Sequence, residues 1–375
     1  MLALLSAIFL CACAGLGVAQ EKKDDKKEEP KVLTLKEKIA ELNKDLEKAS
    51  RDAGKRFGEA TTDDEKTAIR EEFFAQRGKF GQQILELAKE SPKDPAAFDA
   101  TMSAVGMNAK GASDYLVATF VDDPRIVKAI PQLGRGPDGA KALELIGEKS
   151  KSKDVQGAAK FAAVAAEIES ADYPSTGKPL PEKETAAKFA AANAKLAGIV
   201  KDFGDVKTAA TGPGDPPTVA QASKKVKFLV ENLTVGKAAP DAECELLEEG
   251  KKAKLSDYRG SVVVLDIWAT WCGPCRQMIP HEREMVKHFE GKKFKLVSVS
   301  ADAKKETLAK FLEKEEMPWT HWWNGAKGGL IEEYQVRFYP TVYILDGKGV
   351  IRAKHLRGDD LQKFVDKLLA EAGPK

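Results

Sequence analysis

The stretch of sequence that decides the fold of the C-terminal part is Leu265-Asp-Ile-Trp-Ala-Thr-Trp-Cys-Gly-Pro-Cys275. It overlaps a continuous apolar run, Val262–Trp268, which is typical of a central strand buried on both faces. The run ends shortly before the two cysteines, and a helix is predicted to follow them to about Glu290. The pattern therefore places Cys272 and Cys275 where a buried strand ends and a helix begins.

This placement favours redox chemistry. A thiolate at a helix N-terminus faces unpaired backbone N–H groups and the positive end of the helix dipole, and both lower the pKa of the thiol. We expect Cys272 to be the exposed thiol that attacks a substrate disulfide. Cys275, one turn inside the helix, would then resolve the mixed disulfide by attacking Cys272. Pro274 between them would stiffen the turn.

Metal binding is the alternative use of such a cysteine pair. A closed zinc site needs four ligands. The sequence has no second Cys-x-x-Cys, and its four histidines show no paired ligand spacing. A c-type haem would need His directly after Cys275, where Arg276 stands. We therefore expect no metal and no cofactor other than the redox-active Cys272–Cys275 disulfide.

Helix and strand patterns alternate through the C-terminal part. After the cysteines, the predicted elements are a helix to about Glu290, an alternating strand Phe294–Ser300, a helix near Lys304–Lys314, a hairpin of Thr341–Leu345 and Val350–Lys354, and a helix Leu361–Ala372. This order predicts an α/β domain over residues 233–375, with a central mixed sheet and helices on both faces.

The N-terminal part is predicted to be all-α. Thr34-Leu-Lys-Glu37 and Thr62-Asp-Asp-Glu65 are capping boxes that lead into amphipathic helices. Later stretches are rich in Ala, and small residues on helix faces permit close helix packing. We expect a helical domain over residues 32–210, either a bundle or an irregular helical-repeat array. Residues 211–232 would form a linker and a short helix, Val219–Asn232.

The first thirty residues indicate export. Met1–Ala19 is an apolar run ending in small residues, as in a signal peptide, although it has no positively charged start. Residues 20–31 form a charged disordered linker. Leu10-Cys-Ala-Cys13 resembles a lipobox, so the alternative is cleavage before Cys13 and a lipid anchor there. Both interpretations predict a protein of the periplasm or cell envelope, anchored to the membrane as a lipoprotein in the second case.

The composition of the chain argues against several classes of protein. With 375 residues, 43% hydrophobic and 31% charged, it is a soluble chain of two or three domains. Its net charge of +2 is spread evenly, which argues against nucleic-acid binding. No apolar run after the first twenty residues could span a bilayer. Beyond the leader only Cys244, Cys272 and Cys275 remain, too few for a disulfide scaffold, and Cys244 is expected to be a buried, inert thiol.

The stretch around the cysteines resembles the active-site motif of the thioredoxin superfamily. Val235-Gly-Lys-Ala-Ala-Pro-Asp241, Lys254-Leu-Ser-Asp-Tyr-Arg-Gly260 and Phe338-Tyr-Pro-Thr341 are similar to stretches of its exported redoxin, or TlpA-like, thiol–disulfide oxidoreductases. The resemblance covers about residues 233–375, and the helical part resembles extensions seen on some bacterial members. It implies a thioredoxin-like fold and thiol–disulfide oxidoreductase activity.

The resemblance also implies a role for each matching residue. Cys272 would be the nucleophile and Cys275 the resolving thiol. Asp266 would be a buried acid beneath Cys275, with a pKa raised by burial so that it can exchange a proton with that thiol. Pro340 would be the cis-proline of the family, and the backbone beside it would pair with substrate peptide. The implied substrate-binding residues are Trp271, Gly273, Pro274, Tyr339 and Pro340.

The favoured function is an exported enzyme that reduces disulfides of other exported proteins, with electrons from a membrane thiol donor. TlpA-like proteins often have Asn at the position of Asp266 and Glu at that of Met278, so this site is more thioredoxin-like, which argues against a specific role in cytochrome c maturation. One alternative is a thiol peroxidase, although Ala269 and Leu265 replace its usual Thr and Pro. The other is a helical scaffold protein with an accessory redox domain.

Overall fold

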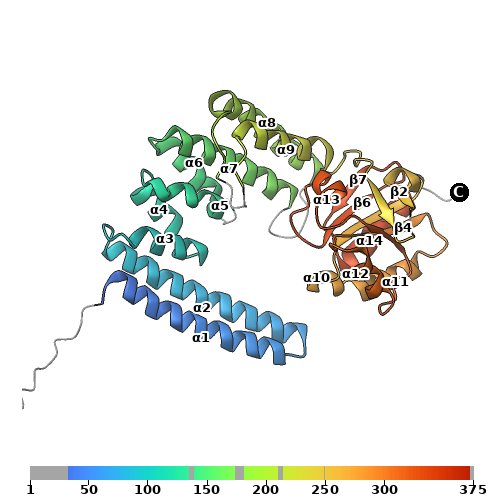
Figure 1. Cartoon of the computed structure of the whole chain (residues 1–375), viewed down its shortest axis with the longest axis horizontal. Coiled ribbons are helices and arrows are strands. Elements are labelled where there is room, and N and C mark those ends of the chain that lie inside the picture. Colours follow the sequence, from blue (N-terminus) through green and yellow to red (C-terminus); the bar gives the residue numbers. More distant parts are fainter. Residues whose placement is uncertain (1–32, 135–138, 174–180, 210–213, 249, 372–375) are drawn as a thin grey trace, which may run out of the picture.

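The computed structural model describes residues 33–134, 139–173, 181–209, 214–248 and 250–371. Within these ranges the chain forms a helical region followed by an α/β domain with one seven-stranded sheet (Figure 1). The predicted leader 1–19, Cys13 and the charged linker 20–31 lie outside the described residues. Among the described helices, none is long and apolar enough to cross a membrane.

The helical region begins with two long helices, α1 (Leu35–Glu59) and α2 (Asp63–Glu90), which pack against each other. Their N-caps are Thr34 and Thr62, and each accepts a hydrogen bond from the backbone N–H three residues later. The glutamate at that third position accepts the N–H of the N-cap in return, so N–H groups that lack a partner inside the helix are satisfied. Both predicted capping boxes are confirmed.

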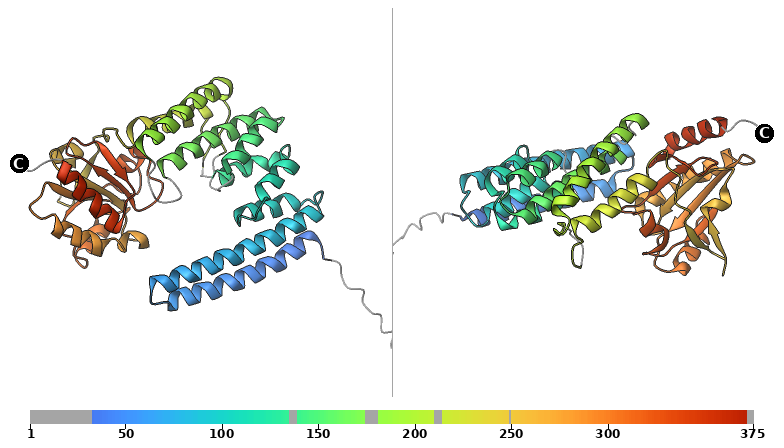
Figure 2. Two further views of the ribbon diagram at one scale, coloured as in Figure 1. Left: turned by 180° about the vertical axis from the view of Figure 1, so that it is seen from behind. Right: turned by 90° about the horizontal axis from the view of Figure 1, so that it is seen from above.

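The remaining helices follow as an array in which successive elements are neighbours in space. They are α3 (Ala97–Gly106), α4 (Ala112–Phe120), η1 (Pro124–Lys128), α5 (Ile130–Leu133), α6 (Gly139–Lys149), α7 (Lys153–Asp172), α8 (Glu182–Phe203) and α9 (Val219–Asn232). The array curves into an arc that ends at the α/β domain (Figures 1 and 2). The structure is therefore the irregular array of the two predicted architectures, and α9 packs against both α7 and α8.

The sheet of the C-terminal domain has the order β2-β1-β5-β4-β3-β6-β7. Its strands are β1 (Glu243–Leu246), β2 (Lys252–Lys254), β3 (Val262–Trp268), β4 (Phe294–Ser300), β5 (Thr320–Trp323), β6 (Thr341–Leu345) and β7 (Ile351–Lys354). The central strand β3 pairs in parallel with β4 and antiparallel with β6. The predicted central mixed sheet is confirmed.

Helices cover both faces of this sheet. Val262 and Val264 of β3 share a core with α11 (Ile279–His288) and α14 (Gly358–Glu371). Val263 and Leu265, which point the other way, share a second core with α12 (Lys305–Leu312) and α13 (Gly329–Glu333). Two short helices, η2 (Leu255–Tyr258) and α10 (Gly273–Arg276), complete the domain.

Two details differ from the sequence-based expectation. Phe294–Ser300 was expected to alternate, but only Lys295 is exposed, because β4 lies inside the sheet between β3 and β5 and is covered on both faces. The helix after the cysteines is split into α10 and α11. Pro280 stands in the first turn of α11, where its missing N–H does no harm.

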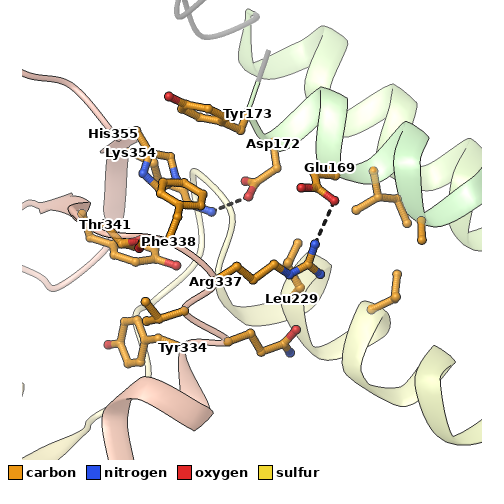
Figure 3. A pocket seen from close by; sticks show the side chains of 16 residues that line it. Glu169, Asp172, Tyr173, Leu229, Tyr334, Arg337, Phe338, Thr341, Lys354 and His355 are labelled. Atoms are coloured by element: carbon orange, nitrogen blue, oxygen red, sulfur yellow. Dashed lines mark hydrogen bonds and ion pairs between the residues drawn. The ribbon is translucent and has the colours of Figure 1, made fainter. Parts of the chain in front are cut away.

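The end of α7 is held against the C-terminal domain by polar contacts (Figure 3). Lys354 Nζ on β7 lies 2.5 Å from Asp172 Oδ2. The Lys354 side chain is buried, with 5% exposed, and the Asp172 side chain is partly buried, with 13% exposed. Burial lowers the pKa of Lys354, and the negative charge of Asp172 opposes this effect. One turn earlier, Glu169 pairs with Arg337 at 2.8 Å, but both of these side chains are exposed. Of these two ion pairs, only Asp172–Lys354 is shielded from water, so removing one of its partners should cost more stability than removing a partner of Glu169–Arg337.

Replacing Asp172 should destabilise the protein, because Lys354 would remain buried without a counter-charge. We expect Asp172→Ala to lower the free energy of unfolding by about 3 kcal/mol or more, measured by urea denaturation followed by circular dichroism. Glu169→Ala, which breaks the exposed pair, should cost less than about 1 kcal/mol. The double variant Asp172→Leu/Lys354→Met should recover most of the loss. Equal effects of Asp172→Ala and Glu169→Ala would contradict this account.

Candidate redox site

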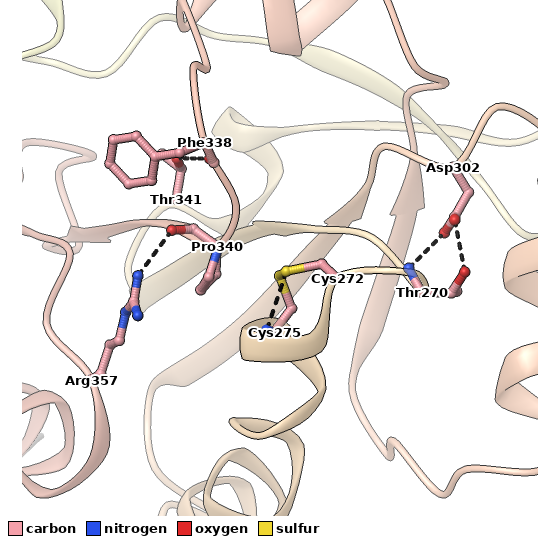
Figure 4. Close-up of a disulfide and its surroundings, with 8 residues drawn as sticks. All are labelled: Thr270, Cys272, Cys275, Asp302, Phe338, Pro340, Thr341 and Arg357. Atoms are coloured by element: carbon pink, nitrogen blue, oxygen red, sulfur yellow. Dashed lines mark hydrogen bonds between the residues drawn. A yellow bond between two sulfur atoms is a disulfide. The ribbon is translucent and has the colours of Figure 1, made fainter. Parts of the chain in front are cut away.

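The two cysteines form a disulfide at the start of α10, where the chain leaves β3 (Figure 4). The S–S distance is 2.04 Å, and the Cα atoms are 5.3 Å apart. Cys272 is the N-cap of α10, and the backbone N–H of Cys275 donates to Cys272 Sγ at 3.2 Å. When the disulfide is reduced, the same N–H can stabilise negative charge on the Cys272 sulfur.

The expected exposure of Cys272 is wrong for this disulfide form. Cys272 is 6% exposed and Cys275 is 3% exposed, so both are buried. The reason is that the Cys272 sulfur bonds back toward Cys275 inside the first turn of α10. The residue that stands out into solvent is Trp271, which is 66% exposed. Gly273 and Pro274 are exposed as well.

The Tyr339–Pro340 peptide bond is cis, as the resemblance implied. This loop lies in the surroundings of the disulfide (Figure 4). The Tyr339 ring contacts the Trp271 ring edge-on, with the ring centroids 5.5 Å apart. Arg357 donates to the Pro340 carbonyl at 3.5 Å, and Thr341 Oγ1 donates to the Phe338 carbonyl at 2.6 Å. Within the described residues, the N–H and C=O of Tyr339 make no hydrogen bond, so both are free to pair with a peptide.

A buried aspartate that sequence reasoning missed fixes the loop before Cys272. Asp302, 1% exposed, accepts hydrogen bonds from the Thr270 hydroxyl at 2.8 Å and the Thr270 N–H at 3.2 Å (Figure 4). Ser300 Oγ donates to the same carboxyl group at 2.7 Å. These bonds tie the end of β4 to the chain that carries the cysteines. The sequence offers little signal for this role, because an Asp just after a strand usually marks a solvated turn.

Asp266 is buried on the face of β3 that α11 covers. It continues the alternation of Val262 and Val264, and it is 4% exposed. Its Oδ1 has no hydrogen-bond partner among the described residues. Burial raises the pKa of Asp266 to about 7, and the positive charge of Arg357 partly opposes the shift. The predicted burial of this acid is confirmed, and its role in proton exchange with Cys275 stays a prediction.

A second buried acid, Glu282, was missed by the sequence analysis. It lies on the inner side of α11, three residues after Ile279 and three before Met285, and it is 1% exposed. Its Oε1 also lacks a partner among the described residues. Burial raises the pKa of Glu282 well above its usual value, and the nearby negative charge of Asp266 raises it further. The two carboxyls are thus coupled, and each disfavours ionisation of the other.

The third cysteine beyond the predicted leader does not join the redox pair. Cys244 lies on β1 and is 5% exposed, and burial raises the pKa of its thiol to about 12. A thiol with this pKa stays protonated at neutral pH, so it is a poor nucleophile. Within the part of the chain that the structure describes, no group of three or more His, Cys, Asp or Glu side chains is arranged to hold a metal ion.

Comparison with known proteins relates this domain to thiol–disulfide exchange enzymes. The family model described as "AhpC/TSA family" matches residues 235–354. The thioredoxin-like protein YneN of Bacillus subtilis is 36% identical over 124 residues, which cover 32% of this chain and 71% of that protein. The thiol-disulfide oxidoreductase ResA of Bacillus thuringiensis is 28% identical over 145 residues, or 38% of this chain and 82% of that protein.

Solved structures give similar matches. The thioredoxin domain of a thiol-disulfide oxidoreductase from Bacteroides vulgatus is 29% identical, and the match covers 37% of this chain and 99% of that domain, with a TM-score of 0.34.

The two buried acids should make stability depend on pH. Since burial raises both pKa values, the folded protein binds more protons than the unfolded chain above about pH 4, up to about pH 7 for Asp266. The free energy of unfolding should therefore fall as the pH rises through this window, by up to about 1.4 kcal/mol per pH unit for each group. Urea denaturation at pH 5, 6, 7 and 8 measures this slope.

Asp266→Asn should flatten that slope and should be more stable than the wild type at pH 8. The double variant Asp266→Asn/Glu282→Gln should flatten it further. Glu284→Gln is the matched control, because Glu284 is exposed on the same helix, α11, and this variant should keep the wild-type slope. A wild-type slope in the double variant would show that the two acids are not its source.

Proposed function

Because this chain belongs to the thioredoxin-like thiol–disulfide oxidoreductases, we propose that it is an exported enzyme that reduces disulfides of other exported proteins. One observation carries the proposal: a Cys-x-x-Cys disulfide caps α10 beside a cis Tyr339–Pro340 peptide bond. A site of this kind offers a reactive sulfur and free backbone groups for an extended peptide in the same place. We call a protein whose disulfide is exchanged here a client.

The reaction is a dithiol–disulfide exchange in two steps. In the reduced enzyme, the Cys272 thiolate attacks one sulfur of the client disulfide, forms a mixed disulfide, and releases the other client sulfur as a thiolate. The Cys275 thiolate then attacks Cys272 Sγ, restores the Cys272–Cys275 disulfide, and releases the second client thiol. The client gains two electrons and two protons, and the enzyme loses them. A thiol donor must then reduce the enzyme again.

The buried acids would supply proton transfer in the second step. Cys275 is 3% exposed in the disulfide form, so water has little access to its sulfur there. A carboxylate with a raised pKa can accept the thiol proton near neutral pH and return it later. Asp266 matches the acid that the resemblance assigns to this task, and Glu282 would help it by keeping one proton within the pair.

The N-terminal sequence supports the proposed location of the protein and the proposed source of its electrons. The apolar run Met1–Ala19 would direct export, and cleavage before Cys13 would instead leave a lipid anchor. Outside the cytoplasm no cytosolic reductant reaches the site, so we propose a membrane thiol carrier as the donor. Both the soluble and the lipid-anchored form could meet such a carrier.

The peroxidase alternative has less support. Leu265 and Ala269 occupy the positions of the Pro and Thr that surround a peroxidatic cysteine, and both are fully buried apolar residues. They offer no hydroxyl to bind a peroxide near Cys272. Consumption of peroxide by a protein that keeps Cys272 but lacks Cys275 would favour this alternative.

Trapping should identify the attacking sulfur. In Cys275→Ser the mixed disulfide cannot be resolved, so this variant should accumulate disulfide-linked client, seen as a band of higher mass on non-reducing gels that dithiothreitol removes. Cys272→Ser is the matched control and should trap little or nothing. Equal trapping by the two variants would contradict the assignment of Cys272 as the nucleophile.

The reduction potential tests the direction of electron flow. We expect a value near that of reducing thioredoxins, about −270 mV, and not the roughly −120 mV of a strong periplasmic oxidant. Titration in thiol buffers followed by Trp fluorescence measures it, since Trp268 and Trp271 lie close to the cysteines in sequence. A value near −120 mV would make the protein a disulfide donor.

A further inference from the structure

Two pairs of aromatic rings meet on the cis-proline loop, one pair next to the disulfide and the other at the end of the helical region. The two pairs are joined through the chain, because Phe338 and Tyr339 are neighbours in sequence. We call Trp271, Tyr339, Phe338 and Tyr173 the aromatic row. Trp271 contacts Tyr339 edge-on, with ring centroids 5.5 Å apart. Phe338 contacts Tyr173 at 5.5 Å with the ring planes tilted by 41° (Figure 3). Tyr173 is the residue at the end of α7, so the helical region contributes the last ring of the row.

The row is unusually exposed for aromatic residues. Trp271 is 66% exposed, Tyr173 41% and Phe338 38%. Only six large hydrophobic side chains are exposed in the described chain, and three of them belong to this row. Exposed apolar side chains that gather in one place mark a binding surface, and aromatic residues are enriched at the centres of such surfaces.

Tyr173 is held in place from several sides. Its N–H donates to the Glu169 carbonyl at 2.8 Å, which closes the last turn of α7. Asp172 and Glu169 join this turn to β7 and to the loop before the cis-proline through the ion pairs with Lys354 and Arg337. The Tyr173 ring also meets the His355 ring edge-on at 4.8 Å. The position of Tyr173 relative to Phe338 is therefore set by contacts with the redox domain.

We propose that Tyr173 and Phe338 together bind an aromatic side chain of the client, close in sequence to the cysteine that is attacked. This inference rests on the proposed function and names the class of client segment. The segment would be extended, because the free N–H and C=O of Tyr339 can pair only with backbone that is not already in a helix or sheet. Because Phe338 is the chain neighbour of Tyr339, an extended segment that pairs with Tyr339 and advances about 3.3 Å per residue would place the aromatic residue within a few residues of the client cysteine.

The surroundings favour an apolar occupant over a charged one. The charged groups nearest to the two rings neutralise one another, Arg337 with Glu169 and Lys354 with Asp172. The two rings also line a cavity of about 70 Å³ that lies between α7 and the cis-proline loop (Figure 3). It has room for about two water molecules. An aromatic side chain would therefore lie across the outside of the rings, and this cavity offers no site for a larger molecule.

The test compares two short peptides that differ at one residue. Each carries one cysteine as a mixed disulfide with glutathione, in a Gly/Ser sequence with either Phe or Ser three residues from the cysteine, placed before it in one pair and after it in another. The reduced protein, with both the helical region and the redox domain, is mixed with each peptide. The rate of its oxidation is followed by Trp fluorescence.

For the wild type we expect the Phe peptide of at least one pair to react about three to ten times faster than the Ser peptide. Tyr173→Ser should bring this ratio below two, whereas Tyr173→Phe, which keeps the ring, should preserve it. Phe74→Ser is the matched control, because Phe74 is an exposed aromatic residue on α2 whose ring partner is Phe73. This control should keep the wild-type ratio.

The ratio separates this inference from the proposed function. Equal rates for the Phe and Ser peptides in both pairs, or a ratio that Tyr173→Ser leaves unchanged, would overturn the inference while disulfide reduction itself stands. A reduced protein that oxidises with none of the peptides, nor with oxidised glutathione, would instead overturn the proposed function. Because each variant is compared with itself on two peptides, a general loss of activity does not alter the result.

Discussion

All seven side chains of β3 are buried, since β4 and β6 flank the strand in the sheet and helices cover both of its faces. This burial fixes the position at which the chain leaves the sheet. The loop that carries Cys272 follows directly after the strand. Asp302, at the end of the neighbouring strand, ties the same loop through Thr270. The reactive sulfurs thus stand directly after a strand that is buried on all sides, in a loop fixed by hydrogen bonds, and this suits an attack that needs a defined geometry.

The core of the domain also contains two carboxyl groups whose burial costs free energy. Asp266 and Glu282 occupy positions where apolar side chains would stabilise the fold, and each keeps a carboxyl oxygen without a partner among the described residues. Burial without a counter-charge favours the protonated form of such groups. A proton held inside the domain near neutral pH would serve the proposed thiol–disulfide exchange, which moves protons. Departures from an apolar core are expected at functional sites.

Local signals in the sequence explain which features could be predicted. The capping boxes at Thr34 and Thr62 and the apolar run of β3 each depend on a few adjacent residues. The cis bond at Pro340 was implied by the family resemblance. The burial of Glu282 could not be predicted from the sequence, because this residue stands in the polar run His281-Glu-Arg-Glu284. Only the placement of α11 over β3 shows which of these residues faces inward. The exposure of Cys272 was misjudged because the disulfide turns its sulfur into α10.

The Asp172–Lys354 pair joins residues that are 182 positions apart. No sequence pattern near either residue predicts this ion pair. Phe228 and Leu229 of α9 likewise pack against the core of the redox domain. The side chains of the two parts thus pack together across their boundary, although the sequence pattern changes there from helices alone to alternating strands and helices. A redox domain expressed without the helical array would expose the ammonium group of Lys354, which is buried in the full chain. It would also expose the apolar surface that Phe228 and Leu229 cover. By covering this surface, the helical array helps to keep the redox domain soluble. An isolated redox domain would need polar substitutions on that surface.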